Sequence, residues 1–415
     1  MGWIDLQVNG YAGVDFNAPG LSADAVRHAT ERLNAAGTAG YLPTFVTGDP
    51  EVVSANMRAI LSARRKYAVC ERSILGFFLE GPFISPEPGA IGTHDRAWVR
   101  APDFTLFSRL QDAAEGMIRM VNVAAELPGA ADFISRVRDG KVVVSLGHQM
   151  AKTPTELKPA ISAGASAFTH LGNGLPNLIH RRENPIWEAL ADDRMKVMFI
   201  PDGHHLTDAM LKVYLRAVPL DRLIAVSDAQ YPAGMPAGDY PVCGTMARLE
   251  PDGLLWNPER NCLVGATAPM AAMMDLLKNR IGATDAECRA IGHDNPLELI
   301  GGFGRDDLVV AHEVLERVQL LVVHHRPQLR PVQLLARLGV DDLLHHTSSQ
   351  MSLFHHPTQF CSSSIRCRRS CCSRRGRATC RSGTWSRTST RGPVSCRTRE
   401  AARCPPGRSE SSTHA

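Results

Sequence analysis

The sequence predicts an α/β fold, a (β/α)₈ barrel of the TIM type in which eight parallel strands alternate with helices. Up to about residue 300, short apolar runs alternate with amphipathic segments, and eight of the runs have the length of strands. The runs are apolar almost throughout, as expected of strands that are covered on both faces. No G-x-G-x-x-G motif follows the first run, which disfavours the alternative of a nucleotide-binding open sheet.

The apolar runs place the strands, and the segments between them place the helices. The segment SADAVRHATERLNAAG predicts a helix that Ser22 can cap and Gly37 can close. Its apolar residues recur on one face, at Val26, Ala29, Leu33 and Ala36. The eight strand candidates are IDLQV (4–8), GYLPTFV (40–46), ILGFFLE (74–80), MVNVAAE (120–126), VVVSLGH (142–148), SAFTH (166–170), VMFIPDG (197–203) and LIAVSDA (223–229).

The barrel domain is predicted to span residues 1–302. Within it, the turn-rich stretch 239–265 has the short runs of a small β insertion, and helices return from Met270 onward. Asn295 and Pro296 predict a break in those helices.

The chain changes character after the barrel. Residues 303–346 predict a helical extension, since apolar residues recur there at helical spacing. Residues 347–415 are rich in Arg, Ser and Cys and contain few aliphatic residues, so we expect a disordered, basic tail. Our hypothesis is that this tail arises from a shifted reading frame or a misplaced gene boundary.

Composition argues against several classes of protein. The 415 residues carry a net charge of only +4, which gives no global reason to expect a nucleic-acid or membrane partner. No apolar run approaches the length of a membrane span, and the N-terminus lacks a signal-peptide pattern, so we expect a cytoplasmic protein. Seven of the eleven cysteines crowd into the tail without the paired spacing of a zinc site.

Polar residues stand at the ends of the predicted strands, where a barrel of this kind carries its chemistry. They are Glu80, His148, His170, the pair His204 and His205, and Asp228. One carboxylate and two imidazoles from three strands suit a divalent transition metal. Asp228 could then take a proton from a water whose pKa the metal lowers. Each residue taken alone has a plainer interpretation, as a hydrogen-bonded structural group or a helix cap.

An ordered set of motifs carries a resemblance over residues 3 to about 300. The motifs are ID-x-QVNG-x-x-GVDF at the start, FFLEGPF (77–83), GTH (92–94), GH (147–148), THLGNG (169–174), DGHH (202–205) and SDA (227–229). This set resembles that of N-acetylglucosamine-6-phosphate deacetylases, a family of metal-dependent hydrolases in the amidohydrolase superfamily. The reaction that the resemblance implies is hydrolysis of the acetamide of N-acetylglucosamine 6-phosphate to glucosamine 6-phosphate and acetate.

The resemblance also implies roles for single residues. Glu80, His148 and His170 would hold one divalent metal ion per subunit, zinc or iron, and Asp228 would be the catalytic acid and base. A homo-oligomer that acts on a small sugar phosphate is implied as well. Contacts to that substrate would come from Thr93, His94, Asn173, Gly174, Arg181, His205, Leu263, Val264 and Gly265. Arg181 fits such a role because a guanidinium matches a phosphate, whereas its neighbour Arg182 is expected to be solvated.

The chain departs from the family pattern at three places. The first strand carries Asp5 and Gln7 where many amidohydrolases have an H-x-H pair, so one metal is expected rather than two. Gly172 replaces an aromatic residue that is common in the family. The small β-sandwich of the family is expected to be incomplete, because segments at both ends differ.

Three alternatives stay open from the sequence. The same machinery could act on another amide or on a cyclic imide. The tail could be a basic arm that binds nucleic acid, although Trp385 is the one aromatic residue interleaved among its arginine-rich runs RCRRS, SRRGR and RSGTWSR. The chain could also be an inactive, truncated remnant of an enzyme.

Overall fold

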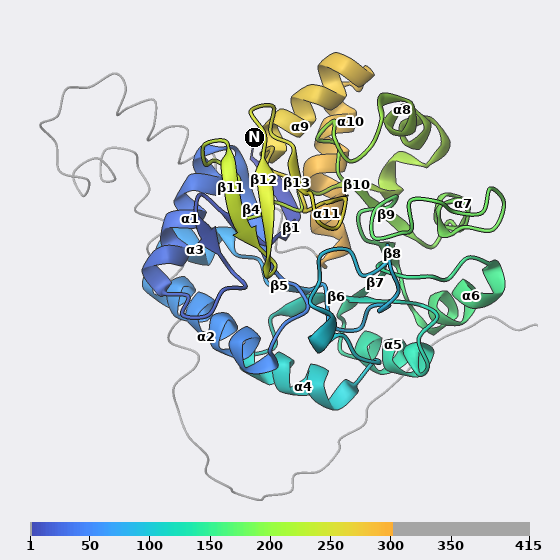
Figure 1. Ribbon diagram of the computed structural model, residues 1–415, viewed down its shortest axis with the longest axis horizontal. Helices are drawn as coiled ribbons and strands as arrows, with labels where there is room; N and C mark the ends of the chain where they lie inside the picture. Colours follow the sequence, from blue (N-terminus) through green and yellow to red (C-terminus); the bar gives the residue numbers. More distant parts are fainter. Residues whose placement is uncertain (1, 302–415) are drawn as a thin grey trace, which may run out of the picture. The chain divides into compact units, whose positions relative to one another are not determined.

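The structure is a computed structural model, and it describes residues 2–301. A ring of eight parallel strands forms its centre. Each strand pairs with the barrel strand before it in the chain, and the helices lie outside the ring (Figure 1). Within the described residues, the ring consists of Trp3–Val8 (β1), Thr38–Phe45 (β4), Phe77–Leu79 (β5), Ile118–Val123 (β6), Val143–Leu146 (β7), Ala167–Phe168 (β8), Lys196–Phe199 (β9) and Leu223–Ala225 (β10).

The first and last strands of the ring meet through a parallel bridge between Val8 and Ala229. The backbone N–H groups of Asn9 and Gly10 also donate to the carbonyl oxygen of Ala229, at 2.7 and 3.2 Å. Ala229 lies just beyond β10, so the ring is nearly closed. The predicted (β/α)₈ barrel is therefore confirmed, and each of the eight predicted runs overlaps one strand of the ring.

Helices follow the strands, as the sequence pattern predicts. In α1, the side chain of Ser22 accepts from the backbone N–H of Ala25, and Val26, Ala29 and Leu33 are buried. Gly37 follows the helix with a φ of 93°, a conformation that glycine adopts without steric cost. The helices between the barrel strands are Ala23–Ala35 (α1), Pro50–Lys66 (α2), Ala68–Ser73 (α3), Phe104–Ala113 (α4), Ala130–Asp139 (α5), Pro154–Ala163 (α6), Pro185–Ala191 (α7) and Asp208–Ala217 (α8).

Strand β1 shows how the barrel separates its apolar and polar side chains. Its residues from Ile4 to Val8 are all buried, although Asp5 and Gln7 are polar. Alternate side chains of a strand point to opposite faces, so Asp5 and Gln7 share one face. Gln7 bonds to side chains that follow β8 and β10, which places that face inside the ring. The barrel interior is therefore polar next to the strand ends that carry the candidate site.

A second sheet lies between β10 and the next helix of the chain. It contains four antiparallel strands and occupies the stretch for which the sequence predicts a β insertion. Its apolar side chains form a small separate cluster, which includes Val242, Leu249 and Leu255. The strands are Gly238–Val242 (β11), Thr245–Leu249 (β12), Leu255–Asn257 (β13) and Cys262–Leu263 (β14), and a short hairpin near the N-terminus pairs Gly10–Tyr11 (β2) with Val14–Asp15 (β3).

The predicted break at Asn295 and Pro296 is wrong, because a helix runs through both residues. The turn before them is a π-helix, in which the backbone N–H of Asn295 donates to the carbonyl oxygen of Ala290. Pro296 is the second residue of the α-helical segment that follows, a position where its missing N–H costs little. The segments are Met270–Leu276 (α9), Leu277–Ile281 (π), Asp285–Arg289 (α10), Ala290–Asp294 (π) and Asn295–Leu299 (α11), and two 3₁₀ turns lie at Arg96–Trp98 and Leu220–Arg222.

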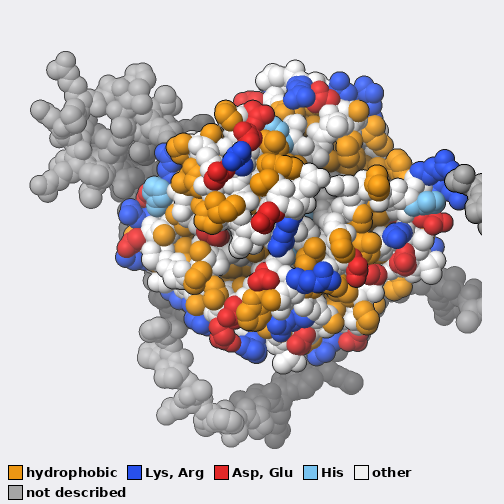
Figure 2. Space-filling view, viewed as in Figure 1, with side chains coloured by type: hydrophobic (Ala, Val, Ile, Leu, Met, Phe, Trp, Pro, Cys, Tyr) orange, Lys and Arg blue, Asp and Glu red, His pale blue; other side chains and the backbone are white. Residues whose placement is uncertain are grey.

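The surface of the described region carries mixed charge. Side chains of both signs lie among apolar ones on the face shown in Figure 2. None of the helices in residues 2–301 is long and apolar enough to cross a bilayer. The predictions for 303–346 and 347–415 fall outside the described residues.

Candidate active site

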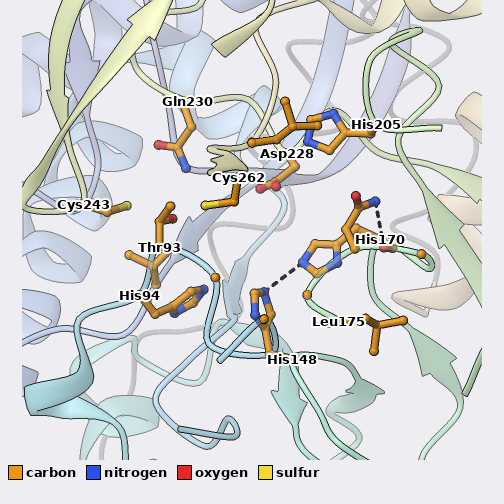
Figure 3. Close-up of a pocket in the computed structure, with 18 of the residues that line it drawn as sticks. Thr93, His94, His148, His170, Leu175, His205, Asp228, Gln230, Cys243 and Cys262 are labelled. Carbon is orange, nitrogen blue, oxygen red and sulfur yellow. Dashed lines mark hydrogen bonds between the residues drawn. The ribbon is translucent and has the colours of Figure 1, made fainter. Parts of the chain in front are cut away.

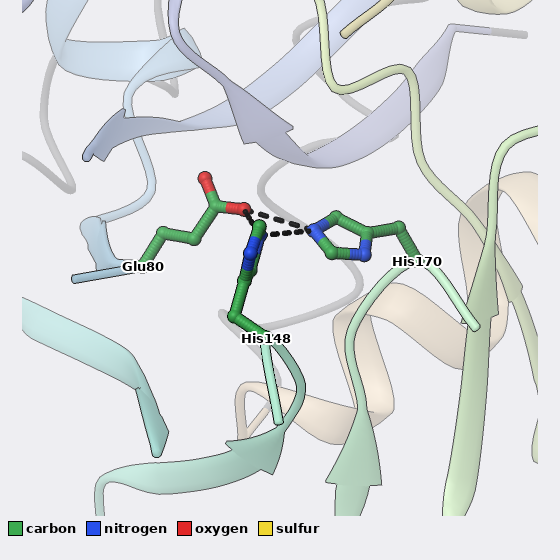
Figure 4. Close-up of side chains that lie close together, drawn as sticks. All are labelled: Glu80, His148 and His170. Carbon is green, nitrogen blue, oxygen red and sulfur yellow. Dashed lines mark hydrogen bonds and ion pairs between the residues drawn. The ribbon is translucent and has the colours of Figure 1, made fainter. Parts of the chain in front are cut away.

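Three side chains that follow β5, β7 and β8 lie close together at one end of the ring. Glu80 follows β5, His148 follows β7 and His170 follows β8. The Nε2 atoms of His148 and His170 lie 3.1 and 2.9 Å from Oε1 of Glu80, and 3.1 Å from each other (Figure 4). All three residues are buried. They form a compact cluster with one ligand atom from each side chain.

The chemistry of this cluster fits a metal ion. His148 donates its Nδ1–H to the carbonyl oxygen of Ala90 at 2.7 Å, so the neutral ring presents a lone pair at Nε2. Burial lowers the pKa of His170, which favours its neutral, ligating form. Burial alone would raise the pKa of Glu80, but the two imidazoles hold it well below its usual range. A carboxylate and two imidazole nitrogens this close together are satisfied best by a shared cation.

The backbone at these strand ends has an uncommon conformation. His148, His170 and Asp228 have φ angles of 51°, 28° and 51°, in or near the left-handed region that non-glycine residues seldom adopt. The turn after each strand therefore directs the side chain across the end of the barrel. Gly174 packs against this arrangement, since a Cβ there would lie only 3.1 Å from Nδ1 of His148. A larger residue at 174 would displace the imidazole.

Asp228 is anchored by the first strand of the barrel. Gln7 and Asn9 donate their side-chain amides to its Oδ1, at 3.1 and 2.6 Å. Burial and the charge of Glu80 raise the pKa of Asp228 well above its usual range, against the lowering effect of the two amides. The carboxyl group is thus held in place and suited to keeping a proton.

A cavity of about 480 Å³ is lined by the Glu-His-His cluster and Asp228 (Figure 3). Cys262 of the second sheet and Leu175 of the loop after β8 stand on its walls. Most residues predicted for the site line this cavity, namely Glu80, Thr93, His94, His148, His170, Asn173, Gly174, His205, Asp228, Leu263 and Gly265.

Two predicted contact residues lie elsewhere in this structure. Arg181 is exposed on the loop before α7, where its carbonyl oxygen accepts from the indole N–H of Trp187. Val264 is buried in the apolar cluster of the second sheet. The structure therefore brings neither side chain to the cavity, and their substrate contacts stay predictions.

His94 is held by groups that the sequence did not point to. The backbone N–H of Thr47 donates to Nδ1 of His94 at 3.2 Å, and the Thr47 hydroxyl lies 2.8 Å from the same atom. Arg260, in the turn before β14, donates to the carbonyl oxygens of Gly92 and His94 at 3.2 and 3.3 Å. The loop that carries His94 is thus fixed from the barrel and from the second sheet.

The partners of Asp228 and part of the cavity wall also escaped the sequence analysis. Gln7 and Asn9 belong to the QVNG motif, and their place at the end of the first strand is the feature that could have identified them as partners of Asp228. No such feature marks the walls from the second sheet and neighbouring loops. These residues are Val46, Gly89, Leu175, Asn177, Gln230, Cys243, Trp256, Asn261 and Cys262. Gly92, Gly172 and His204, which belong to the motifs quoted from the sequence, also line the cavity.

The barrel and the Glu-His-His cluster beside a buried aspartate define a hydrolase of the metal-dependent class. No protein-family model matches the sequence. N-acetylglucosamine-6-phosphate deacetylase from Bos taurus is 30% identical over 334 residues, which cover 76% of this chain and 79% of the relative. N-acetylgalactosamine-6-phosphate deacetylase from Escherichia coli O157:H7 is 29% identical over 306 residues, or 72% and 77% of the two chains.

Solved structures give the same result. N-acetyl-D-glucosamine-6-phosphate deacetylase from Mycobacterium smegmatis has a TM-score of 0.66 at 27% identity, over 72% of this chain and 77% of that one. The enzyme from Pasteurella multocida has a TM-score of 0.65 at 28% identity, over 72% and 76%. The chain belongs to the N-acetylglucosamine-6-phosphate deacetylase family. The resemblance drawn from the motifs is thereby confirmed.

Proposed function

We propose that the chain hydrolyses the acetamide of N-acetylglucosamine 6-phosphate and releases acetate and glucosamine 6-phosphate. The observation that carries this proposal is the convergence of Glu80, His148 and His170 beside Asp228 at the floor of the cavity. Membership of the deacetylase family supports an amino-sugar phosphate rather than a cyclic imide as the substrate.

Glu80, His148 and His170 are the residues to which we assign one divalent metal ion, zinc or iron. Such an ion supplies Lewis-acid chemistry, polarising the acetyl carbonyl and activating a water. The protein contributes the fixed position of the ligands, because Ala90 orients His148. Asp5 and Gln7 occupy the first strand where a second metal site would need histidines, which supports one ion rather than two.

Asp228 is the residue to which we assign proton transfer. Gln7 and Asn9 both donate to Oδ1, so we assign Oδ2 to the transfer itself. Oδ2 would take a proton from the attacking water, and the raised pKa of the carboxyl group favours its retention there. The same oxygen would then protonate the departing amine, which must leave as a neutral group.

The cavity walls are assigned to the sugar and its phosphate. Thr93, His94, Asn173 and His205 line the cavity and offer hydroxyl, imidazole and amide groups to hydroxyls and phosphate oxygens. Leu263 and the backbone at Gly174 and Gly265 complete the wall. Arg181 could join them only through a contact that this structure does not contain.

The test is acetate release by the purified, metal-loaded chain. N-acetylglucosamine 6-phosphate should be hydrolysed, and chelation followed by readdition of zinc or iron should abolish and restore the activity. Lack of turnover in a folded, metal-loaded protein would refute the proposal.

A second substrate is favoured by the comparisons. The relative from E. coli O157:H7 is named for N-acetylgalactosamine 6-phosphate, which differs from the first substrate in the configuration at one carbon. Assaying both epimers at equal concentration decides between them, since the preferred epimer should have the higher kcat/KM.

A homo-oligomer is the assembly that we infer. Support comes from three apolar side chains in and after the loop that follows β8, where Leu178, Ile179 and Trp187 are 92%, 40% and 52% exposed. Exposed apolar residues so close together are typical of a protein interface. Light scattering after size-exclusion chromatography gives the mass, and a monomer at micromolar concentration would contradict the inference. The cytoplasmic location stays a prediction.

A further inference from the structure

Asp202 and His205 form a buried pair on the loop that follows β9. Oδ2 of Asp202 lies 2.7 Å from Nδ1 of His205, and the two side chains are only 3% and 4% exposed. Oδ1 of Asp202 accepts the backbone N–H groups of His204 and His205, both at 2.9 Å. The carboxylate is therefore fully engaged by the loop that carries His205.

The turn that makes this possible depends on Gly203. Its φ of 86° lies in the left-handed region, which lets the chain fold back so that two successive N–H groups meet one carboxylate oxygen. Because Asp202 occupies Nδ1, Nε2 is the nitrogen that His205 has left for the cavity it lines. Asp202 thus determines both the tilt of the imidazole and the nitrogen that it offers.

The chemistry of a phosphate agrees with this arrangement. Phosphate oxygens accept hydrogen bonds, so Nε2 must carry a proton to bind one. A ring that donates from both nitrogens is positively charged, and the carboxylate beside it balances that charge. Burial would raise the pKa of Asp202, but the hydrogen bonds from His205 and from the backbone lower it overall, which keeps the carboxylate ionised.

We propose that Asp202 is a positioning residue that holds His205 so that its Nε2–H binds the phosphate of the substrate. The inference deepens the proposed function and rests on it for the identity of the ligand. It assigns specificity for a phosphorylated sugar to Asp202 and His205, which lie on the loop after β9.

Asp202→Asn is the discriminating variant. Asparagine keeps an oxygen for the two backbone N–H groups, but its amide donates to Nδ1 and removes the negative charge. We expect calorimetric titration of the zinc-loaded full chain to show about 10-fold weaker binding of glucosamine 6-phosphate. His205→Gln should show a similar loss, and the double variant should bind no more weakly than His205→Gln.

A ratio of activities separates positioning from a general structural effect. Asp202→Asn should lower kcat/KM for N-acetylglucosamine 6-phosphate about 10-fold relative to that for unphosphorylated N-acetylglucosamine. Asp208→Asn is the matched control, because Asp208 pairs with Arg280 at 2.9 Å, whereas His205 pairs with Asp202. We expect that variant to behave like the parent.

Three outcomes would overturn the inference: parent-like binding by Asp202→Asn or by His205→Gln, losses that multiply in the double variant, or equal losses on both sugars. Failure of the proposed function looks different. A parent chain that hydrolyses neither sugar would refute that function, whereas the titration with glucosamine 6-phosphate would still decide the role of Asp202. A parent that does not bind this ligand would refute the inference directly.

Discussion

Asn9 donates its side-chain amide to Oδ1 of Asp228 at 2.6 Å, although 219 residues separate the two in the chain. The bond joins the end of the first strand of the ring to the end of the last, beside the bridge between Val8 and Ala229. The position of Asp228, the candidate proton-transfer group, therefore depends on closure of the barrel between its first and last strands. A barrel that opened at this seam would also release Asp228.

Substitutions at Asn9 and Asp228 should affect catalysis to different degrees. We expect Asp228→Asn to lower kcat by about 10²- to 10⁴-fold, because the amide cannot accept a proton. Asn9→Ala should lower kcat by about 10-fold, since it removes one hydrogen bond to a charged group. Steady-state kinetics with metal analysis check both, and metal content should not change. Asn34→Ala, which removes an amide between α1 and α3, is the control.

Metal binding should depend on all three members of the Glu-His-His cluster. His148→Ala or His170→Ala should lose bound zinc or iron and nearly all activity, because two ligands hold an ion far less tightly than three. Elemental analysis after gel filtration measures the metal per chain. His180→Ala removes an exposed imidazole and should retain the parent stoichiometry. A full metal load in His170→Ala would show that the ion sits elsewhere.

The sequence predicts the Glu-His-His cluster because the fold brings these residues together. Glu80, His148 and His170 end three strands of a barrel, and strand ends of a barrel converge at one rim. Once the strands are placed by their apolar runs, the convergence follows without further information. Family membership rests on the same residues, since they lie within the motifs.

Other parts of the site depend on contacts that no local pattern encodes. The partnership of Asn9 with Asp228 requires the ring to close, and the support of His94 by Thr47 joins two loops far apart in the chain. Arg181 illustrates the opposite case: a guanidinium suits phosphate chemically, yet Arg181 is exposed and does not line the cavity in this structure, so its substrate contact stays a prediction. At Pro296, a preceding π-helical turn overrides the usual tendency of proline to end a helix.

Thr47 should influence turnover through His94. Because Nδ1 of His94 accepts from Thr47, the ring proton resides on Nε2 and makes His94 a donor. Burial and then the charge of His148 lower the pKa of His94 to about 3, so it stays neutral at working pH. Thr47→Val removes the hydroxyl and should lower kcat about 10-fold. Thr47→Ser keeps it and should approach the parent, and an equal loss in both variants would refute this role.

Asp5 should make the metal-free fold less stable as the pH rises. Burial raises its pKa from 3.8 to about 6, despite hydrogen bonds from Ser227 and Gln7. Stability from the neutral carboxyl group is complete below pH 3.8 and is lost as the pH rises through about 6. The gap between the two pKa values corresponds to about 3 kcal/mol. Asp5→Asn keeps an acceptor for the same backbone groups but cannot ionise, so its advantage over the parent in urea unfolding should grow from pH 4 to pH 7. Parallel curves for the two proteins would show that Asp5 does not titrate in this range.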